Sequence, residues 1–536
     1  MYDNAEARGS TGRKRLRPKE LEGSRMRAFA MLALGTALMA VMPATVQAAK
    51  PKAGPTPATE VLAETTAGQV RGVDGGKGVS AFLGIPYAAP PVGENRWREP
   101  RPAAPWTGVR DATKYGADCL QAPFPPDAAP IRTTPSEDCL FVNVWKPSAA
   151  KPGAKLPVMV WVHGGGFVNG GSSPAVYSGE NFARDGVVLI SLNYRLGRFG
   201  FFAHPALASE GYGGNYGYLD QIAALKWVQA NAASFGGDPA NVTVFGESAG
   251  GMSMHMLLQA PEARGLFSKV IVESGAGRDR SLPTPTVAVA AKAGELFAPG
   301  LDAAALRALP AEKVTGDLSM MTMSQPTYSG PMLDGRTIFG SPVEAIAGGL
   351  YAKVPVMVGS NSADGLPFGT DKDKIWASYG PRADEARKLY DPTGQGAPLQ
   401  VAVMTSADRT FIEPARAVAR GLAQRGQSAW LYRFAYAHPT FRDAMGGAPH
   451  ASEIPYVFDT LAARTQWKVV PGEQAVASAT HKRWIDFAVT GTPGADWPAA
   501  TADDTKVMLI AEKSTEHVED PYRARLDFVE SIAGGK

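Results

Sequence analysis

The stretch FGESAGG, residues 245–251, joins two segments of opposite character. An apolar, β-branched run, NVTV, precedes it, and MSMHMLLQA, which has the composition of a helix, follows it. Gly246 and Gly250 lack a Cβ atom, so the chain can turn sharply and pack closely there. A turn that tight would push the hydroxyl of Ser248 outward above the end of a strand, which is the geometry of a nucleophile elbow. Taken alone, Gly-x-Ser-x-Gly fits an ordinary strand-to-helix turn equally well.

The stretch WVHGGGFVNGG, residues 161–171, supplies a second part of such a site, a glycine loop over residues 163–171. Three consecutive glycines after a buried strand leave main-chain N–H groups unobstructed, and such donors can stabilise a developing oxyanion. A glycine-rich turn can also bind phosphate, but no Lys-Ser or Lys-Thr pair follows, which excludes a P-loop. His163 followed by three glycines, well before a Gly-x-Ser-x-Gly, is the oxyanion motif of lipases and esterases.

Residues 1–48 have the features of a targeting segment. A basic start precedes an apolar run over residues 28–41, and the letters VQA, ending at Ala48, form a small-x-small cleavage pattern. The run is too short to span a membrane comfortably. We therefore expect a signal segment that is cleaved after Ala48, with translation starting at Met1 or Met26, and export to the periplasm or outside the cell.

The charge balance excludes one class of partner. The whole chain has 54 Lys and Arg and 51 Asp and Glu, and residues 1–48 contain eight of the former and four of the latter. The remainder has 46 basic and 47 acidic groups, so nothing indicates binding to nucleic acid. Residues 49–60 are expected to form a flexible mature N-terminus. No second apolar stretch is long enough for a stable membrane anchor, and no obligatory protein partner is indicated.

The chain has two cysteines, Cys119 and Cys139, and both lie in the part that would be exported. An oxidising compartment favours a disulfide. It would close a loop of about 20 residues and stabilise the fold by roughly 3 kcal/mol in the chain-entropy model. Two reduced, buried thiols are the alternative that the sequence leaves open.

Apolar runs alternate with helix-like segments between residues 60 and 275. This alternation predicts a mostly parallel central sheet with helices on both faces, and ligands bind such sheets at the carboxyl ends of the strands. ETTAGQVRGV and VSAFLGIPYA predict short antiparallel strands before it. Residues 276–350 are expected to form an insertion over the site, and residues 370–430 are expected to be helical. ASATHKRWIDFAVTG, ending at Gly491, is expected to be the last helix.

With these motifs in order, the sequence resembles the type-B carboxylesterases, the carboxylesterase/cholinesterase branch of the α/β-hydrolases. The resemblance covers about residues 61–520 and implies an α/β-hydrolase fold with helical insertions over the active site, a single domain over residues 61–530. It also implies oxyanion donors at the N–H groups of Gly165, Gly166 and Ala249, and a Cys119–Cys139 disulfide. The stretches that carry it are NRWREPRPAAPWTGVRDATKYGADC, SEDCLFVNVW, PVMVWVHGGGF, LNYRLGRFGFFAHP, GNYGYLDQIAALKWVQANAASFGGDPANVTVFGESAGG and HASEIPYVF.

The general base must be a histidine, and the chain has seven. In α/β-hydrolases the histidine follows both the nucleophile and the acid in the chain. His450 lies in the loop-like stretch GGAPHASEIPYVF, from which a base can reach across to a strand end, and the resemblance selects the same residue. The other six are expected elsewhere: His163 in the glycine loop, His204 before the nucleophile, His255 among methionines, His438 at a strand end, and His481 and His517 on the surface.

The acid is expected at a strand end between the nucleophile and the base. GSNSADG, residues 359–365, follows the strand-like run VPVMV, and related esterases carry an acid immediately before the glycine. That residue is Asp364 here, where many relatives have glutamate. Asp334 and Glu344 are the alternative acids. Asp364 could also be an ordinary acid in a surface turn, with no part in catalysis.

These residues predict a serine carboxylester hydrolase that works through an acyl-enzyme. His450 would take the proton as the Ser248 Oγ attacks an ester carbonyl, and Asp364 would orient the imidazole and stabilise its charged form. Water would then release the acyl group by the same route, with neither a metal nor an organic cofactor. Glu247 and Ser274 are expected to support the site, although Glu247 could also be a solvated carboxylate.

The loop between the cysteines limits the substrate class. Cholinesterases hold a quaternary ammonium against a tryptophan in this loop by cation–π attraction, but LQAPFPPDAAPIRTTPSED contains no Trp. Its five prolines and the lack of an apolar helical stripe also disfavour a lipase lid. We therefore expect a small or medium carboxylic ester as substrate. An amide or carbamate hydrolase, or a non-catalytic adhesion relative of the same fold, are the alternatives.

Overall fold

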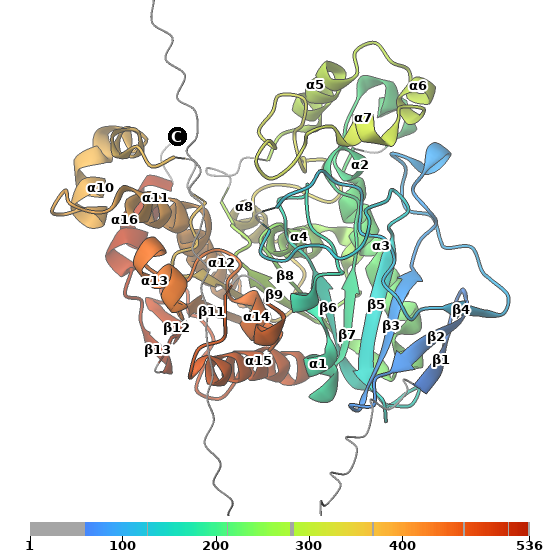
Figure 1. Cartoon of the computed structure of the whole chain (residues 1–536). Helices are drawn as coiled ribbons and strands as arrows, with labels where there is room; N and C mark the ends of the chain where they lie inside the picture. The colour runs from blue at the N-terminus through green and yellow to red at the C-terminus, as the bar shows by residue number, and fades with distance from the viewer. Residues whose placement is uncertain are drawn as a thin grey trace, which may run out of the picture. The chain divides into compact units, whose positions relative to one another are not determined.

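Thirteen strands form one sheet in the described part of the chain (Figure 1). The computed structural model describes residues 59–533 except 126, 212, 279–283, 367–368, 465–466 and 513, so the expected signal segment lies outside the described residues. Those residues fall within one compact unit, Thr56–Lys536. The order across the sheet is β1 (Thr59–Thr65), β2 (Gly68–Asp74), β3 (Val79–Pro86), β5 (Phe141–Pro147), β7 (Val188–Leu192), β6 (Leu156–Val162), β8 (Gly237–Glu247), β9 (Lys269–Glu273), β10 (Val356–Asn361), β11 (Ala429–Phe434), β12 (Lys506–Ile510) and β13 (Thr515–Glu519), with β4 (Val109–Asp111) beside β2.

The centre of the sheet is parallel and its margins are antiparallel. The neighbours from β7 through β6, β8, β9, β10 and β11 to β12 all pair in parallel. The pairs formed by β1, β2, β3, β5 and β7 at one margin, and by β12 and β13 at the other, are antiparallel. The short β4 pairs in parallel with β2. This arrangement confirms both the predicted parallel core and the antiparallel strands before it.

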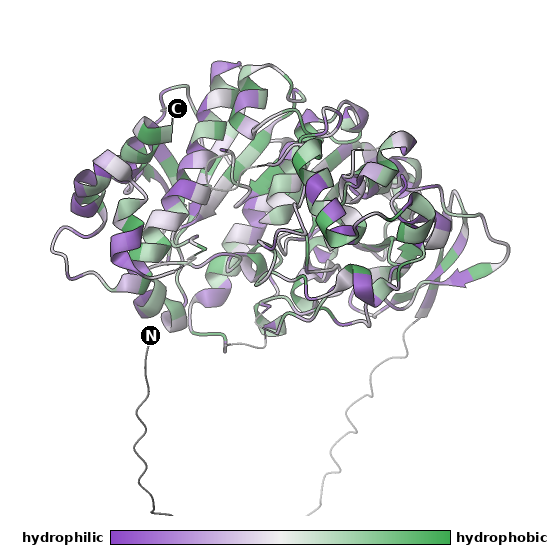
Figure 2. Ribbon diagram, turned by 90° about the horizontal axis from the view of Figure 1, so that it is seen from above, coloured by the Kyte–Doolittle hydropathy of each residue, from purple (hydrophilic) through white to green (hydrophobic). Residues whose placement is uncertain are grey.

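Helices cover both faces of the sheet, because a parallel sheet must bury both. Along β6, Val158 and Val160 pack with residues of α3, α4 and α12, while Met159 and Trp161 pack on the opposite face with residues of α1 and α15. The helices carry hydrophobic and hydrophilic residues side by side (Figure 2), as expected of elements with one buried face. Their bounds are α1 (Glu180–Arg184), α2 (Gly197–Gly200), α3 (Tyr216–Asn231), α4 (Ala249–Gln259), α5 (Val287–Phe297), α6 (Ala303–Arg307), α7 (Ala311–Thr315), α8 (Pro342–Ala347), α9 (Lys372–Ala377), α10 (Ala383–Tyr390), α11 (Pro398–Ala407), α12 (Glu413–Gln424), α13 (Pro439–Met445), α14 (Ile454–Val457), α15 (Glu473–Thr490) and α16 (Arg523–Ala533).

The helical predictions hold with two corrections. Helices α9 to α12 occupy the stretch predicted to be helical, and α15 ends at Thr490, capped by Gly491 with a left-handed φ of 81°. However, α15 is not the last helix, because α16 follows it and buries Leu526 and Phe528. His481 on α15 is not a surface residue either: its ring lies 4.4 Å from that of Phe182, and its Nδ1 lies 2.6 Å from the Val457 carbonyl.

The stretch predicted as an insertion contains α5 to α8. Helices α5, α6 and α7 lie together near α2 (Figure 1), whereas α8 packs on α12. None of the described helices is long and apolar enough to cross a membrane.

Candidate active site

Ser248 lies in a tight turn between β8 and α4. Its φ of 57° and ψ of −120° are rare for a residue with a side chain, and such strain is often held at functional sites. Its N–H donates to the Glu273 carbonyl over 3.0 Å. A Cβ built on Gly246 or Gly250 would lie 2.6 or 2.0 Å from the Val162 carbonyl oxygen. Both positions therefore need glycine, as the sequence pattern predicted.

A chain of hydrogen bonds joins Ser248, His450 and Asp364. The Ser248 Oγ lies 2.9 Å from the His450 Nε2, and the Asp364 Oδ1 lies 2.6 Å from the His450 Nδ1. Because a carboxylate only accepts, Nδ1 carries the proton and Nε2 is left to accept one from the serine. The other oxygen of Asp364 accepts from the Ser274 hydroxyl at 2.7 Å and from the Asn361 N–H at 2.9 Å. Asp364 is thus held on both sides.

Burial and neighbouring charge act in opposite directions on His450. Burial alone would lower its pKa, but the charge of Asp364 and its hydrogen bond outweigh burial and raise the pKa above 6.5. The ring also stacks on Phe411, with ring centres 4.9 Å apart. The Glu247 Oε1 lies 3.3 Å from the His450 Nε2. Burial, followed by the charges of Asp364 and Glu273, raises the pKa of Glu247 well above 4.5, which favours its neutral form.

Two further buried carboxyl groups lie near the site, and the sequence did not single out either one. Burial raises the pKa of Glu273 to about 8, although the Trp484 indole donates to it over 2.7 Å. Burial and the charge of Glu247 raise the pKa of Glu453, which accepts a hydrogen bond from Asn361. Glu453 follows His450 by three residues in HASEIPYVF, but nothing in that spacing indicated its burial.

The glycine loop lies against Ser248. A Cβ on Gly164 would lie 3.1 Å from the Ser248 Cβ. Gly165 and Gly166 have left-handed φ values of 99° and 61°. The N–H groups of Gly165, Gly166 and Ala249 have no hydrogen-bond acceptor in the part of the chain that the structure describes. Ala249 is the first residue of α4, where the helix dipole also favours negative charge.

His163 has a structural place, as predicted. Its Nδ1 donates to the Gly164 carbonyl over 2.9 Å, and its ring stacks on Tyr194 with ring centres 4.5 Å apart. Burial lowers the pKa of His163 to about 4, so the ring is neutral at pH 7.

A cavity of about 240 Å³ opens onto Ser248 and His450. Met320 is part of its wall, which agrees with the prediction that residues 276–350 form an insertion over the site. A larger cavity of about 550 Å³ lies between Tyr87, Trp227 and Glu262 and contains no residue of the hydrogen-bond chain. The walls of the smaller cavity include Phe124, Ala128, Ala129, Gly164, Gly165, Val176, Tyr177, Glu247, Met320, Leu366, Ile454, Pro455, Arg464 and Trp467.

The predicted disulfide between Cys119 and Cys139 is present. It closes the loop that contributes Phe124 and Ala129 to the cavity wall.

The alternative acids and bases serve other purposes. Asp334 accepts hydrogen bonds from Thr337 and Asn215, and Glu344 caps α8. His438 caps α13, and the His255 Nδ1 lies 2.9 Å from the Tyr351 hydroxyl.

A family model described as "Carboxylesterase family" matches residues 59–391 and 384–529. Para-nitrobenzyl esterase of Bacillus subtilis (strain 168) is 37% identical over 86% of this chain and 97% of its own length. Fumonisin B1 esterase of Sphingopyxis macrogoltabida is 36% identical over 84% of this chain and 86% of its own. Phenmedipham hydrolase of Pseudarthrobacter oxydans is 35% identical over 87% and 98%.

Solved structures agree with these matches. A structure titled PNB esterase superposes with a TM-score of 0.76 at 34% identity, over 87% of this chain and 99% of the other. These matches span nearly all of the described residues, including the motifs around Ser248 and His450. The chain therefore belongs to the carboxylesterase family, the carboxylic-ester hydrolases of the α/β-hydrolase fold.

Proposed function

We propose that the protein hydrolyses small to medium carboxylic esters through an acyl-enzyme on Ser248. The observation that carries this proposal is the continuous hydrogen-bond chain from Asp364 through His450 to Ser248 at a cavity of about 240 Å³. A cavity of this size suits a modest acyl or alcohol group.

The residues of the site act together in the first step. The Ser248 Oγ attacks the ester carbonyl carbon while its proton moves to the His450 Nε2, and Asp364 stabilises the resulting imidazolium. The carbonyl oxygen becomes an oxyanion, which accepts hydrogen bonds from Gly165, Gly166 and Ala249.

Two stages follow, the collapse of this tetrahedral intermediate to the acyl-enzyme and the hydrolysis of the acyl-enzyme through a second one. The imidazolium returns its proton to the alcohol oxygen as the carbon–oxygen bond breaks, and the acyl group stays on the serine. A water molecule, deprotonated by the same imidazole, attacks the acyl-enzyme. The acid leaves, and the serine recovers its proton.

The test is pre-steady-state kinetics with p-nitrophenyl esters of increasing acyl length. The wild type should release a burst of nitrophenol equal to the enzyme concentration, and Ser248→Ala should lose both burst and turnover. A folded wild type without turnover on the whole ester series would overturn the proposal. The matching p-nitroanilides and carbamates show whether amides or carbamates are turned over as well, since the same machinery can act on them.

We also propose that the protein matures outside the reducing cytoplasm. Support comes from the Cys119–Cys139 disulfide and from the signal-like residues 1–48. Sequencing the N-terminus of protein recovered from the periplasm or medium tests it, and cleavage after Ala48 is the expected result.

A further inference from the structure

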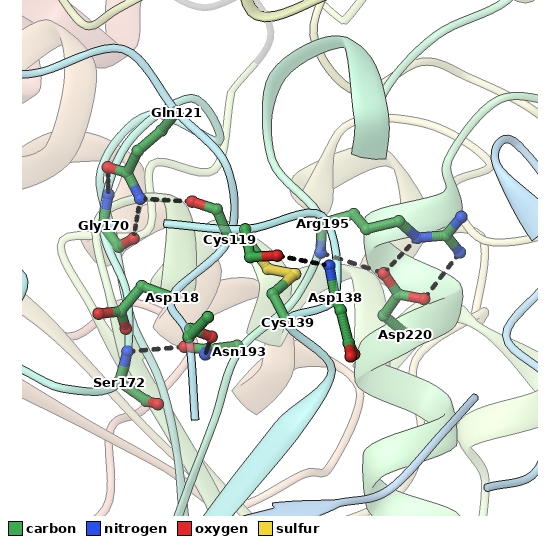
Figure 3. The surroundings of a disulfide bond; sticks show 12 residues. Asp118, Cys119, Gln121, Asp138, Cys139, Gly170, Ser172, Asn193, Arg195 and Asp220 are labelled. Carbon is green, nitrogen blue, oxygen red and sulfur yellow. Dashed lines mark hydrogen bonds and ion pairs between the residues drawn. A yellow bond between two sulfur atoms is a disulfide. The ribbon is translucent and has the colours of Figure 1, made fainter. Parts of the chain in front are cut away.

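The side chain of Gln121, in the disulfide-closed loop, forms a pair of hydrogen bonds with Gly170 of the glycine loop (Figure 3). The Gln121 Nε2 donates to the Gly170 carbonyl over 2.6 Å, and the Gly170 N–H donates back to the Gln121 Oε1 over 2.9 Å. The same Nε2 donates to the Cys119 carbonyl over 2.9 Å, and Oε1 accepts from the Asn169 Nδ2 over 3.2 Å. Both donors and both acceptor sites of the amide are therefore used.

The contact with Gly170 fixes the orientation of the Gln121 amide. Gly170 presents one donor and one acceptor, and a flipped amide would face each with a group of the same kind. The two partners are the N–H and the carbonyl of one residue, so the hydrogen bonds hold the peptide groups on both sides of the Gly170 Cα. The Cys119 carbonyl, next to the disulfide, accepts the second hydrogen of the same Nε2 and so anchors the amide.

Gly170 packs directly on the turn that carries the oxyanion donors. A Cβ on Gly170 would lie 2.7 Å from the Gly164 carbonyl oxygen and 2.6 Å from the His163 Nδ1. The preceding residue, Asn169, donates its N–H to the Gly165 carbonyl over 2.9 Å. A displacement of Gly170 must therefore move Gly164 or Gly165, since no free space separates them.

Asn169 extends the same contact to the insertion. Its Oδ1 accepts from the Met320 N–H over 2.9 Å, and its Nδ2 donates to the Ala122 carbonyl over 2.8 Å. Met320 in turn packs on Gly166, where a Cβ would lie 2.3 Å from the methionine sulfur.

We propose that Gln121 is a positioning residue, which fixes the N–H groups of Gly165 and Gly166 where the oxyanion forms. The proposal rests on the proposed function. It predicts an effect on the transition state rather than on ester binding, because these donors act on charge that develops only during the reaction.

The test compares Gln121→Met, which keeps side-chain length but removes all four hydrogen bonds, with Thr134→Ala, an exposed position in the same loop. For Gln121→Met, kcat should fall about ten- to a hundredfold, since small misplacement of a catalytic group costs that much, while KM changes less than about threefold. An aryl trifluoromethyl ketone, whose adduct with Ser248 bears the oxyanion, should lose affinity by the same factor as kcat/KM. Thr134→Ala should match the wild type.

The outcomes separate this proposal from the function on which it rests. Wild-type kcat and ketone affinity in Gln121→Met, even with a lower Tm, would mean a purely structural role and overturn it. If Gln121→Met does not fold, Gln121→Glu is the second variant. It keeps the acceptor for Gly170 and Asn169 but places a carboxylate oxygen against the carbonyls of Gly170 and Cys119. Its kcat and its ketone affinity should fall together by about tenfold or more relative to the wild type, and no fall would also overturn the proposal. An active wild type with unaffected variants removes only the role of Gln121, whereas an inactive wild type removes the proposed function itself.

Discussion

At the scale of single residues, His450 sets the pH dependence. It accepts the serine proton only when neutral, so kcat/KM should fall as pH falls through its pKa. Since Asp364 raises that pKa above 6.5, the midpoint of the acidic limb should lie above 6.5. In Asp364→Asn the negative charge is lost, so the midpoint should move down. The rate should also fall about 10⁴-fold, because the amide no longer fixes the tautomer. A pH profile of kcat/KM for both proteins measures this, and an unchanged midpoint would contradict the role of Asp364.

Glu247 should tolerate replacement by glutamine. Burial and the nearby carboxylates hold its pKa well above 4.5, and glutamine has the shape of the neutral acid. Glu247→Gln should therefore keep kcat/KM at pH 7 within about tenfold of the wild type, far from the roughly 10⁴-fold expected for Asp364→Asn. Steady-state kinetics of Glu247→Gln and Asp364→Asn, measured side by side, test this difference in kcat/KM. Equal losses would show that Glu247 acts as an anion beside His450.

The sequence identifies Ser248, Asp364 and His450 because each lies at a fixed offset in a short motif. Gln121 and Glu273 could not be found in this way. Their partners are Gly170, 49 residues away, and Trp484, 211 residues away. Such contacts depend on how strands and loops come together, which no local pattern records.

At the scale of elements, the junction of β8 and α4 depends on close backbone packing. A Cβ on Gly250 would lie 2.0 Å from the Val162 carbonyl, and a main-chain atom of a central strand cannot move aside. Gly250→Ala should therefore lower the free energy of unfolding by about 3 kcal/mol or more. Gly75→Ala is the control, because no atom lies within 4 Å of its added Cβ, and its change should stay within about 0.5 kcal/mol. Urea unfolding of both variants measures the difference, and equal midpoints would contradict the packing.

Helices α15 and α16 differ in whether a local signal in the sequence marks them. The end of α15 is marked by Gly491 itself. Helix α16 is short, and Arg416 holds it through ion pairs of 2.7 Å to Asp527 and 2.9 Å to Glu530. That stabilisation comes from a helix more than 100 residues earlier, so no local pattern marks a helix within this end of the predicted domain. The burial of His481 was missed for the same reason.

At the scale of the whole molecule, the candidate active site is assembled from loops far apart in the chain. Ser248 follows β8 and Asp364 follows β10, on either side of β9 in the parallel core, while the cavity wall comes from the disulfide-closed loop, the insertion and the stretch around α14. The fold class followed from the alternation of strands and helices. The shape of the cavity did not, because loop conformation depends on contacts between these distant segments.

The disulfide links the stability of the molecule to the shape of its cavity. In the chain-entropy model, a loop of about 20 residues contributes roughly 3 kcal/mol, so replacing Cys119 and Cys139 together by serine should lower the unfolding free energy by about that amount. Phe124 and Ala129 of this loop line the cavity, and a looser loop would confine the acyl group less. The double variant should therefore discriminate less between short and long p-nitrophenyl esters. Urea unfolding and the chain-length profile of kcat/KM measure the two effects. A loss of stability with an unchanged profile would show that the rest of the wall, including Met320 and Ile454, sets the acyl preference without the disulfide.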